Sequence, residues 1–501
     1  MTLQKKLYES YLRYSAQEAI ITDSSSENYN ELFKNAFRIS TYLLKIINCS
    51  NSIISLIFSE SKNYIYGILG TLYSRNIFMP LDITHPINKL MNYFLSVDCK
   101  YTIIDRGVSP FIIEKLRKMN IKVVFIEDMI DSKVQTIIFD YKKYQEEDAI
   151  YIYFTSGSTG TPKAILGMNK SLLHFIEWEK REFNISHNDI FAQITSPTFD
   201  PYLRDIFTPL CSGAKIQLVN SNIILVPRLF GNFLKNSEIT FLHTTPSILS
   251  NLMHHTFPKD HFKKLKYLLI AGEMLHPELI KAWYSNYHNH TQIVNLYGPT
   301  ETTLAKVFAR ISYEFSDNIV PVGKPIDDTM LHVLNVNDFI ECDEEEVGEI
   351  YIETEYMTLG YYNDNENFCK AKDKKKCYAT GDLGYIKKGN LYLIGRKDDQ
   401  LKIGGVRINL NEIRVTILAY TKIKDCAVLY EDSLLICFYV SSVQLTLKNL
   451  RRFLENYLLP IHIPQKFIKL NELPITVNGK VDKDRLINEY YMFQKGCNYK
   501  T

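Results

Sequence analysis

The chain has 501 residues, 46% of them hydrophobic and 23% charged, which is the composition of a globular protein with roughly two to four domains. A net charge of +2 argues against nucleic acid or an anionic membrane as the main partner, and no apolar run approaches the roughly 18 residues that span a bilayer. Nine cysteines without a Cys-x-x-Cys pair or a His/Cys cluster predict a reducing, cytoplasmic setting with neither structural zinc nor a disulfide framework.

The first 150 residues predict a doubly wound α/β sheet. Apolar residues at helical spacing run through residues 3–48, and short β-branched runs then alternate with helical stretches. We expect a helix near Tyr64–Ser74 and strands at Ile53–Phe58, Thr102–Ile104, Lys122–Ile126 and Thr136–Phe139. Alternation at this spacing is typical of parallel sheets with helices on both faces.

Residues Ile150–Phe154 form a short apolar run that predicts a buried strand, and this run leads directly into a loop of hydroxyl and glycine residues. Glycines let the backbone turn tightly and bring its N–H groups to an anion, and Lys163 adds a positive charge after the loop. The pattern predicts a polyphosphate-binding loop made of Thr155, Ser156, Gly157, Ser158, Thr159 and Gly160. It is not a Walker A loop, because Pro162 precedes the lysine and Ala164 follows it. The alternative is an ordinary Ser/Gly turn.

The rest of the chain divides into three segments with different patterns of predicted secondary structure. Strand–helix alternation continues to about residue 296, with strands expected near residues 190–195, 215–219, 240–243, 267–271 and 292–296. From about residue 318, short strands split by Gly, Asn and Asp predict a small β barrel or meander, with strands at Met330–Val336, Glu349–Glu353 and Leu391–Ile394. The last hundred residues mix predicted helices at Leu410–Ala419 and Thr446–Leu458 with strands at Asp425–Leu429 and Leu434–Val440. The charged run from Arg396 to Gln400 predicts a domain boundary, which gives domains of residues 1–396 and 397–501.

Five short motifs resemble, in the same order, the signatures of the adenylate-forming superfamily, which includes acyl-CoA synthetases, luciferases and the adenylation domains of nonribosomal peptide synthetases. They are the glycine-rich loop, Asn295–Glu301, Tyr378–Gly384, Gly395–Asp398 and Leu473–Lys480. Any one of them is a common turn; their order over residues 151–480 carries the resemblance. It implies a large N-terminal domain of two doubly wound sheets with a small β barrel, followed by a small mobile α+β domain. The chain departs from the usual pattern at Ala164, where the family has glycine, and at Asn409, where it often has glutamate.

The resemblance implies a site for ATP and Mg²⁺. Tyr297 would lie against the adenine, Asp382 would accept hydrogen bonds from the ribose hydroxyls, and Arg396 would reach the ribose or a phosphate. Glu301 would bind Mg²⁺, because a hard cation fits between carboxylate and phosphate oxygens. The remaining implied ATP-binding residues are the loop residues 155–160 with Lys163, Gly272, Glu273, Asn295, Leu296, Gly298, Pro299, Thr300 and Lys480.

The catalytic residues implied by the same resemblance are Lys480, Lys163 and Glu301. Lys480 would place an ammonium between the attacking carboxylate and the α-phosphate, where it offsets the repulsion of two anions; such a contact is typically worth ~10²–10³ in rate. Asp398 would be the hinge of the small domain, and the loop from Lys402 to Leu410 would enter the site after rotation.

The segment Phe199–Phe207 aligns with the part of the family that begins the substrate pocket. Asp200 stands where amino-acid-activating members keep an aspartate for the substrate ammonium. The implied pocket residues are Asp200, Pro201, Arg204, His243, Leu269, Ala271, Leu296, Leu304, Ala305 and Lys480. A buried arginine needs an anion, so Arg204 and His243 together predict a substrate with a second carboxylate, such as aspartate or glutamate. The alternative is that Arg204 pairs with a protein carboxylate such as Asp205.

The implied reaction joins an amino acid to ATP, releases pyrophosphate, and passes the acyl group to the phosphopantetheine thiol of a carrier protein. The chain ends soon after Lys480 without a carrier-protein serine motif, so we expect the carrier to act in trans. One alternative is an acyl- or aryl-CoA synthetase, against which Asp200 argues. Another is a catalytically silent homologue that acts as a binding protein, against which Lys163, Glu301, Asp382 and Lys480 argue.

Overall fold

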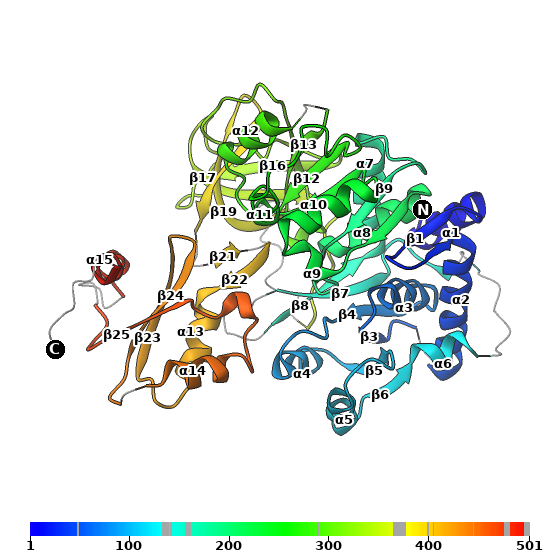
Figure 1. The fold of residues 1–501 in the computed structure, drawn as a ribbon, viewed down its shortest axis with the longest axis horizontal. Helices are drawn as coiled ribbons and strands as arrows, with labels where there is room; N and C mark the ends of the chain where they lie inside the picture. The colour runs from blue at the N-terminus through cyan, green and yellow to red at the C-terminus, as the bar shows by residue number, and fades with distance from the viewer. Residues whose placement is uncertain are drawn as a thin grey trace.

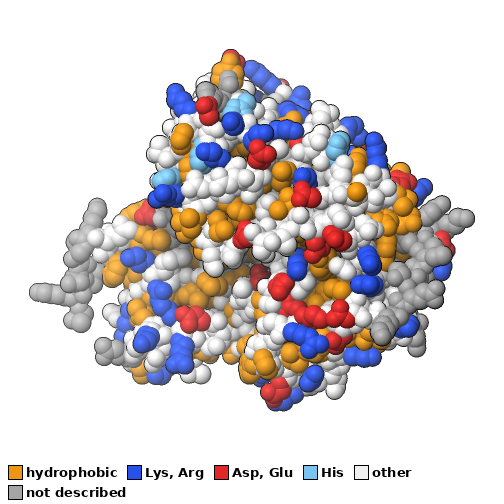
Figure 2. Space-filling model, turned by 45° about the vertical axis from the view of Figure 1, so that its right-hand side comes forward, with side chains coloured by type: hydrophobic (Ala, Val, Ile, Leu, Met, Phe, Trp, Pro, Cys, Tyr) orange, Lys and Arg blue, Asp and Glu red, His pale blue; other side chains and the backbone are white. Residues whose placement is uncertain are grey.

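The structure is a computed structural model that describes residues 1–47, 50–132, 140, 143–155, 162–287, 290–363, 377–397, 400–403, 405–443, 445–474 and 481–494. A large α/β region carries the N-terminus, and a smaller region, orange to red in Figure 1, packs beside it. In the described part of the chain, no helix is long and apolar enough to cross a bilayer. Acidic and basic side chains are interspersed over the face shown in Figure 2, as expected for a net charge near zero.

The first large sheet has seven strands in the order β18-β8-β7-β4-β3-β5-β6. Strands β3 to β7 run parallel to their neighbours, whereas β8 pairs antiparallel with β7 and β18. The strands are β3 Ile53–Ile57, β4 Ile77–Pro80, β5 Cys99–Ile104, β6 Lys122–Phe125, β7 Ala149–Thr155, β8 Lys163–Met168 and β18 Gly360–Tyr361. The helices of this segment are α2 Tyr29–Ile46, α3 Ser61–Tyr73, α4 Ile87–Leu95, α5 Pro110–Lys118 and α6 Ile126–Ile130. All five residues of β3 are buried, as in parallel strands with both faces covered.

The second large sheet has nine strands in the order β15-β14-β13-β12-β11-β9-β10-β1-β2. They are β1 Glu18–Ile21, β2 Ser26–Asn28, β9 Ile190–Gln193, β10 Lys215–Leu218, β11 Phe241–Thr244, β12 Tyr267–Ala271, β13 Gln292–Tyr297, β14 Val307–Ile311 and β15 Lys324–Pro325. Its helices are α1 Leu3–Tyr14, α7 Asn169–Glu182, α8 Pro201–Ser212, α9 Ser221–Ile224, α10 Pro227–Asn236, α11 Pro246–Leu252 and α12 Pro277–Asn286. The two expected doubly wound sheets are therefore confirmed.

The segment between α1 and α2 differs from the expectation of helical structure through residues 3–48. Residues 18–28 form the hairpin β1–β2, in which β1 pairs parallel with β10, Ile20 opposite Ile216. Because β1 forms by pairing with β10, which is distant in the sequence, no local periodicity marks it as a strand. The start of α2 did carry a local signal, because Asn28 and Glu31 form a capping box. The expected strand at Thr136–Phe139 lies outside the described residues.

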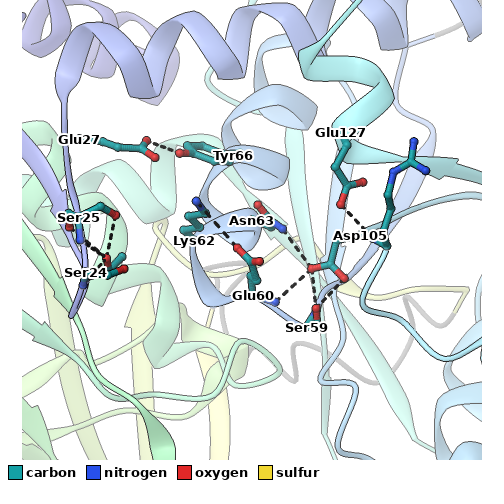
Figure 3. A network of polar contacts seen from close by, with 12 residues as sticks. Ser24, Ser25, Glu27, Ser59, Glu60, Lys62, Asn63, Tyr66, Asp105 and Glu127 are labelled. Carbon is teal, nitrogen blue, oxygen red and sulfur yellow. Dashed lines mark hydrogen bonds and ion pairs between the residues drawn. The ribbon is translucent and has the colours of Figure 1, made fainter.

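A buried carboxylate fixes the loop that leaves β3 for α3, at the point where the chain order of the seven-stranded sheet reverses. Asp105, at the end of β5, accepts hydrogen bonds from the backbone N–H groups of Ser59 and Glu60, from the Ser59 hydroxyl and from the Asn63 amide, at 2.8–3.1 Å (Figure 3). These four hydrogen bonds compensate for the burial of the carboxylate and link the end of β5 to the start of α3.

The strands expected to form a small barrel or meander form a four-stranded antiparallel sheet in the order β16-β17-β19-β20. They are β16 Thr329–Leu334, β17 Gly348–Thr354, β19 Cys377–Lys387 and β20 Asn390–Arg396. The C-terminal region follows with the hairpin β21 Gln400–Ile403 and β22 Val406–Asn409, then α13 Leu410–Leu418, β23 Asp425–Glu431, β24 Leu434–Val440, α14 Leu447–Leu454, a 3-10 turn at Pro460–His462, β25 Lys466–Leu470 and α15 Lys483–Gln494. It is the α+β mixture that the sequence predicts.

Candidate active site

A cavity of 440 Å³ opens at the carboxyl ends of β12 and β13 and is closed on its far side by β19 and β20. Ligands of open α/β sheets bind at this edge, because the loops that follow the strands meet there. Eight of the residues implied for ATP line the cavity: Gly272, Glu273, Asn295, Leu296, Tyr297, Gly298, Asp382 and Arg396. The pocket residues Ala271 and Ala305 line it as well.

Asp382 lies at the meeting point of the two sheets that form this cavity. Its Oδ2 accepts a hydrogen bond of 2.6 Å from the Tyr297 hydroxyl, and its Oδ1 accepts one of 2.5 Å from the Arg396 guanidinium. Burial, together with the carboxylate, raises the pKa of the Tyr297 hydroxyl well above its usual value, so this hydroxyl remains a donor. A carboxylate has about four acceptor positions, so Asp382 keeps capacity for the two ribose hydroxyls.

A second cavity, of 130 Å³, adjoins the first, and both are lined by Ala271, Gly272, Gly298, Asp382 and Arg396. Its other lining residues include Thr155 from the end of β7, Asp200 immediately before α8, Pro201 and Arg204 from α8, and Pro299, Thr300 and Leu304 from the turn after β13. The residues implied for the nucleotide and those implied for the acyl substrate therefore surround one continuous space.

The turn after β13 is shaped by steric constraints. A Cβ on Gly298 would lie 2.3 Å from the Leu304 carbonyl oxygen, so only glycine fits there. Leu304 itself has a φ of 60° and Thr303 one of 65°, a conformation that costs energy in residues with side chains. Within this turn, the Thr300 hydroxyl donates to Asp200 Oδ1 at 2.9 Å. This hydrogen bond joins Asp200, the expected ligand of the substrate ammonium, to Thr300, the expected phosphate contact.

Lys163 and Glu301 line neither of the two cavities, but both contact Tyr361, which the sequence did not reveal. Lys163 pairs with Thr155 across the β7–β8 hairpin, and its Nζ lies 4.9 Å from the centroid of the Tyr361 ring. The Tyr361 hydroxyl donates to Glu301 Oε1 at 2.9 Å. Tyr361 belongs to β18, a two-residue strand that pairs with β8. No sequence motif marked it, because only the pairing of β18 with β8 brings it to the site. Ser156, Gly157, Ser158, Thr159, Gly160, Asp398 and Lys480 lie outside the described residues.

The described residues fit a Mg²⁺ ion that is bound by one protein carboxylate together with substrate phosphates. Mg²⁺ in nucleotide-binding sites is held by one or two carboxylates together with substrate phosphates rather than by a cage of protein ligands. The described residues contain no group of three or more His, Cys, Asp or Glu side chains that could hold a metal ion. Glu301 is a buried carboxylate that accepts a hydrogen bond from the Tyr361 hydroxyl, and it directly follows Thr300, the expected phosphate contact.

Arg204 is the unusual residue of the small cavity. Its side chain is 4% exposed, and its Nε is buried without a hydrogen-bond partner. Within the described part of the chain, its guanidinium forms no ion pair, including with Asp205, the alternative partner. A buried cation without an anion is costly, which makes Arg204 a candidate for binding a negative group of the substrate.

His243 is placed differently from the prediction that it binds substrate beside Arg204. Both of its ring nitrogens face carboxylates, with Nδ1 2.8 Å from Asp205 Oδ1 and Nε2 3.0 Å from Glu179 Oε1. Neither His243 nor Leu269 lines either cavity. Glu179 was not predicted, although a signal was present: it continues the apolar stripe of α7 after Leu172, Phe175 and Ile176.

The tip of the C-terminal hairpin β21–β22 reaches the site. Gly405 lines the 130 Å³ cavity, and its N–H donates to Glu273 Oε1 at 2.8 Å. The other oxygen of Glu273 accepts from the backbone N–H and hydroxyl of Ser247 at the start of α11. A predicted ATP-binding residue therefore connects the large region with the hairpin.

Comparison with known proteins agrees with this geometry. The sequence profile of AMP-binding enzymes matches residues 7–362. Zwittermicin A synthase ZmaJ of Bacillus cereus is 28% identical over 96% of this chain and 94% of that protein. Tyrocidine synthase 1 of Brevibacillus parabrevis is 26% identical over 93% of this chain, which spans 43% of that larger protein. Among solved structures, the adenylation domain AlmE of Vibrio cholerae superposes with a TM-score of 0.83 at 20% identity, covering 98% of this chain and 97% of that one.

The α/β fold, the adjoining cavities lined by residues implied for a nucleotide and an acyl substrate, and the match to AMP-binding enzymes identify an AMP-forming ligase. The chain belongs to the AMP-binding enzyme family. The matched proteins include peptide synthetase adenylation domains, in agreement with the resemblance found in the sequence, and also an o-succinylbenzoate CoA synthetase of Bacillus subtilis, whose structure superposes with a TM-score of 0.84 at 17% identity.

Proposed function

We propose that this protein activates an amino acid that carries a second carboxylate, by transferring AMP from ATP to one of its carboxyl groups. The observation that carries the proposal is the buried guanidinium of Arg204 in the 130 Å³ cavity that Asp200 also lines: its Nε has no hydrogen-bond partner, and it forms no ion pair with any residue that the structure describes. Asp200 would bind the substrate ammonium and Arg204 the second carboxylate. A bidentate guanidinium–carboxylate pair supplies both the charge and the geometry for such selectivity.

In the proposed reaction, a carboxylate oxygen of the amino acid attacks the α-phosphorus of ATP. The new oxygen–phosphorus bond forms as the bond to pyrophosphate breaks, which yields acyl-AMP. Asp382 and Tyr297 orient the nucleoside, Arg396 and Lys163 bind oxygens of the ribose or phosphates, and Lys480 stabilises charge at the α-phosphate. Mg²⁺ held by Glu301 would neutralise phosphate charge. The relative AlmE was crystallised with glycyl-adenosine-5'-phosphate, an aminoacyl adenylate.

We further propose that the acyl group is transferred to the phosphopantetheine thiol of a carrier protein in trans, and that the chain divides into domains of residues 1–396 and 397–501 with a hinge near Asp398. Support comes from the hairpin tip at Gly405, which reaches the cavity where acyl-AMP would form. Thiol attack on the acyl carbon would release AMP. A cytoplasmic location remains a prediction from the cysteine pattern.

The test is ATP–pyrophosphate exchange with a panel of amino acids that includes aspartate, glutamate, asparagine and glutamine. We expect exchange with an acidic amino acid, and a loss of about 10²-fold in kcat/KM for it in Arg204→Ala, since a charge-assisted pair is removed from a buried site. Arg181→Ala, which removes an exposed arginine paired with Asp327, is the matched control.

Three other results would contradict the proposal in different ways. Exchange with a neutral amino acid, unaffected by Arg204→Ala, would retain adenylation and reject the acidic substrate. AMP release that requires CoA and a carboxylic acid without an amino group would indicate an acyl- or aryl-CoA synthetase. Absence of all ATP turnover would indicate a binding protein.

A further inference from the structure

Next to the small cavity lies a cluster of buried polar side chains from α7, α8 and β11. His243 lies between Asp205, at 2.8 Å, and Glu179, at 3.0 Å, and all three side chains are at most 1% exposed. The other oxygen of Glu179 accepts a hydrogen bond of 2.6 Å from the Thr208 hydroxyl. Every side chain of this cluster thus has a hydrogen-bond partner, as buried polar groups require.

Two carboxylates facing one imidazole favour the imidazolium. Burial and the nearby Arg204 cation lower the pKa of His243, but Glu179 and Asp205 outweigh them, so that its pKa is raised. Both ring nitrogens then donate, one to each carboxylate. The groups that face His243 are Glu179 from α7 and Arg204 and Asp205 from α8, while β9 contributes the Phe191 ring at 5.9 Å.

Arg204 is close enough to this cluster for its charge to lower the pKa of His243, yet it forms no ion pair with Asp205. The four buried charges, two negative and two positive, balance when His243 is protonated. Asp205 Oδ1 is then bound to His243, and no carboxylate within the cluster attracts the guanidinium into a pair. With a neutral residue in place of His243, Arg204 would be the only cation beside two buried carboxylates, and pairing with Asp205 would be strongly favoured.

We propose that His243 is a positioning residue for substrate selection: by binding Asp205 and Glu179, it keeps the Arg204 guanidinium available to the second carboxylate of the substrate. This inference rests on the proposed function, because it explains how the acid-binding arginine stays unpaired. His243 therefore contributes to specificity without contacting the substrate, in place of the direct contact that the sequence suggested.

The test compares the wild type, His243→Gln and the double variant His243→Gln/Asp205→Asn in pyrophosphate exchange with the acidic amino acid that the wild type accepts. We expect KM for that amino acid to rise about 10- to 100-fold in His243→Gln, with kcat and the KM for ATP within about twofold, since Asp205 then captures Arg204. Replacing Asp205 removes the competing carboxylate, so the double variant should recover most of the lost affinity. Because KM does not depend on the fraction of active enzyme, partial unfolding would not imitate this pattern.

If His243→Gln does not fold, Glu179→Gln provides a second measurement. Deprotonation of His243 should free Asp205 to pair with Arg204, so KM for the acidic amino acid should rise with increasing pH. Loss of one carboxylate lowers the pKa of His243, so in Glu179→Gln this rise should begin at a lower pH than in the wild type. An unchanged KM in His243→Gln, or a double variant no better than the single one, would overturn the inference while leaving the Arg204 proposal intact. Failure of the wild type to accept any acidic amino acid would instead reject the proposed function itself.

Discussion

Single side chains connect the parts of this site that sequence motifs describe separately. Tyr297 and Arg396 come from different motifs, yet both hold the carboxylate of Asp382. Thr300 bonds to Asp200, which ties the second motif to the substrate pocket. Tyr361 belongs to no motif and connects the two residues expected to act on the phosphates, Lys163 and Glu301. Such connecting groups determine orientation and therefore affect rate and affinity without reacting.

Tyr361 offers a test of the proposed Mg²⁺ ligand. Tyr361→Phe keeps the ring beneath Lys163 and removes only the hydroxyl that orients Glu301. Loss of an outer hydrogen bond to a metal ligand typically weakens metal binding 10- to 100-fold, so the Mg²⁺ concentration for half-maximal pyrophosphate exchange should rise by about tenfold. Tyr362→Phe, the neighbour that packs against the core of the seven-stranded sheet, is the control. An unchanged Mg²⁺ requirement would show that Glu301 is not the ligand or needs no orientation.

The hairpin β21–β22 is the element by which the C-terminal region enters the site. Gly405 at its tip has a φ of 76°, and an added Cβ would lie 2.6 Å from Thr245 Cγ2. Gly272, with a φ of 94°, lies opposite, and a Cβ there would be 3.1 Å from the Cα of Gly405. Two glycines are thus needed for the close approach of two backbones.

Gly405→Ala should therefore affect thiol transfer more than adenylation. Strain of a left-handed non-glycine residue together with the contact to Thr245 disfavours this hairpin position, by an amount of order 1–3 kcal/mol. With pantetheine as the acceptor thiol, release of AMP should fall about tenfold relative to pyrophosphate exchange measured on the same sample. Gly389→Ala, at a turn with nothing within 4 Å of the added Cβ, controls for a left-handed glycine away from the site. Equal loss of both activities would contradict a separate role for the hairpin.

Elements whose pattern is local were predictable, and those that depend on distant partners were not. Strands β12 and β24 have the predicted bounds because each is a short apolar run between turns. The hairpin β1–β2 was not predicted, because β1 forms by pairing with the distant strand β10. The candidate site follows the same rule: Asp382, Arg396 and Arg204 stood in recognisable motifs. Tyr361 became evident only when the fold brought it to Glu301, whereas Glu179 lay on the apolar stripe of α7 but its contact with His243 depended on the fold.

Across the whole molecule, the C-terminal region packs on the large region through buried ionisable groups. Lys89 of α4 lies 3.8 Å from Glu412 of α13, and both residues are 9% exposed. Burial lowers the pKa of Lys89 and raises that of Glu412. His85 and His462 are buried beside this pair, and burial lowers the pKa of both, that of His85 to about 4. The contact between the two regions is thus made by groups that are stable there only in particular protonation states.

Acid should loosen this contact. A histidine whose pKa is lower in the folded than in the unfolded protein stabilises the fold fully above the unfolded value of about 6.5, and that stabilisation is lost as the pH falls towards the folded value. Between about pH 6.5 and pH 4, the two histidines bind protons in the unfolded protein but not when they are buried beside the Lys89 ammonium, so a falling pH favours the unfolded state. We expect the midpoint of thermal unfolding of the C-terminal region, and its resistance to proteolysis, to fall over this range.

His462→Asn provides the comparison for this pH dependence, because it removes one titrating group from the interface. The decline in its midpoint between pH 6.5 and pH 4 should be shallower than in the wild type, although its midpoint at pH 7.5 will be lower from lost packing. His254→Gln, which removes an exposed histidine of the large region, should reproduce the wild-type slope. If His462→Asn had the same slope as the wild type, carboxylates elsewhere would account for the acid sensitivity.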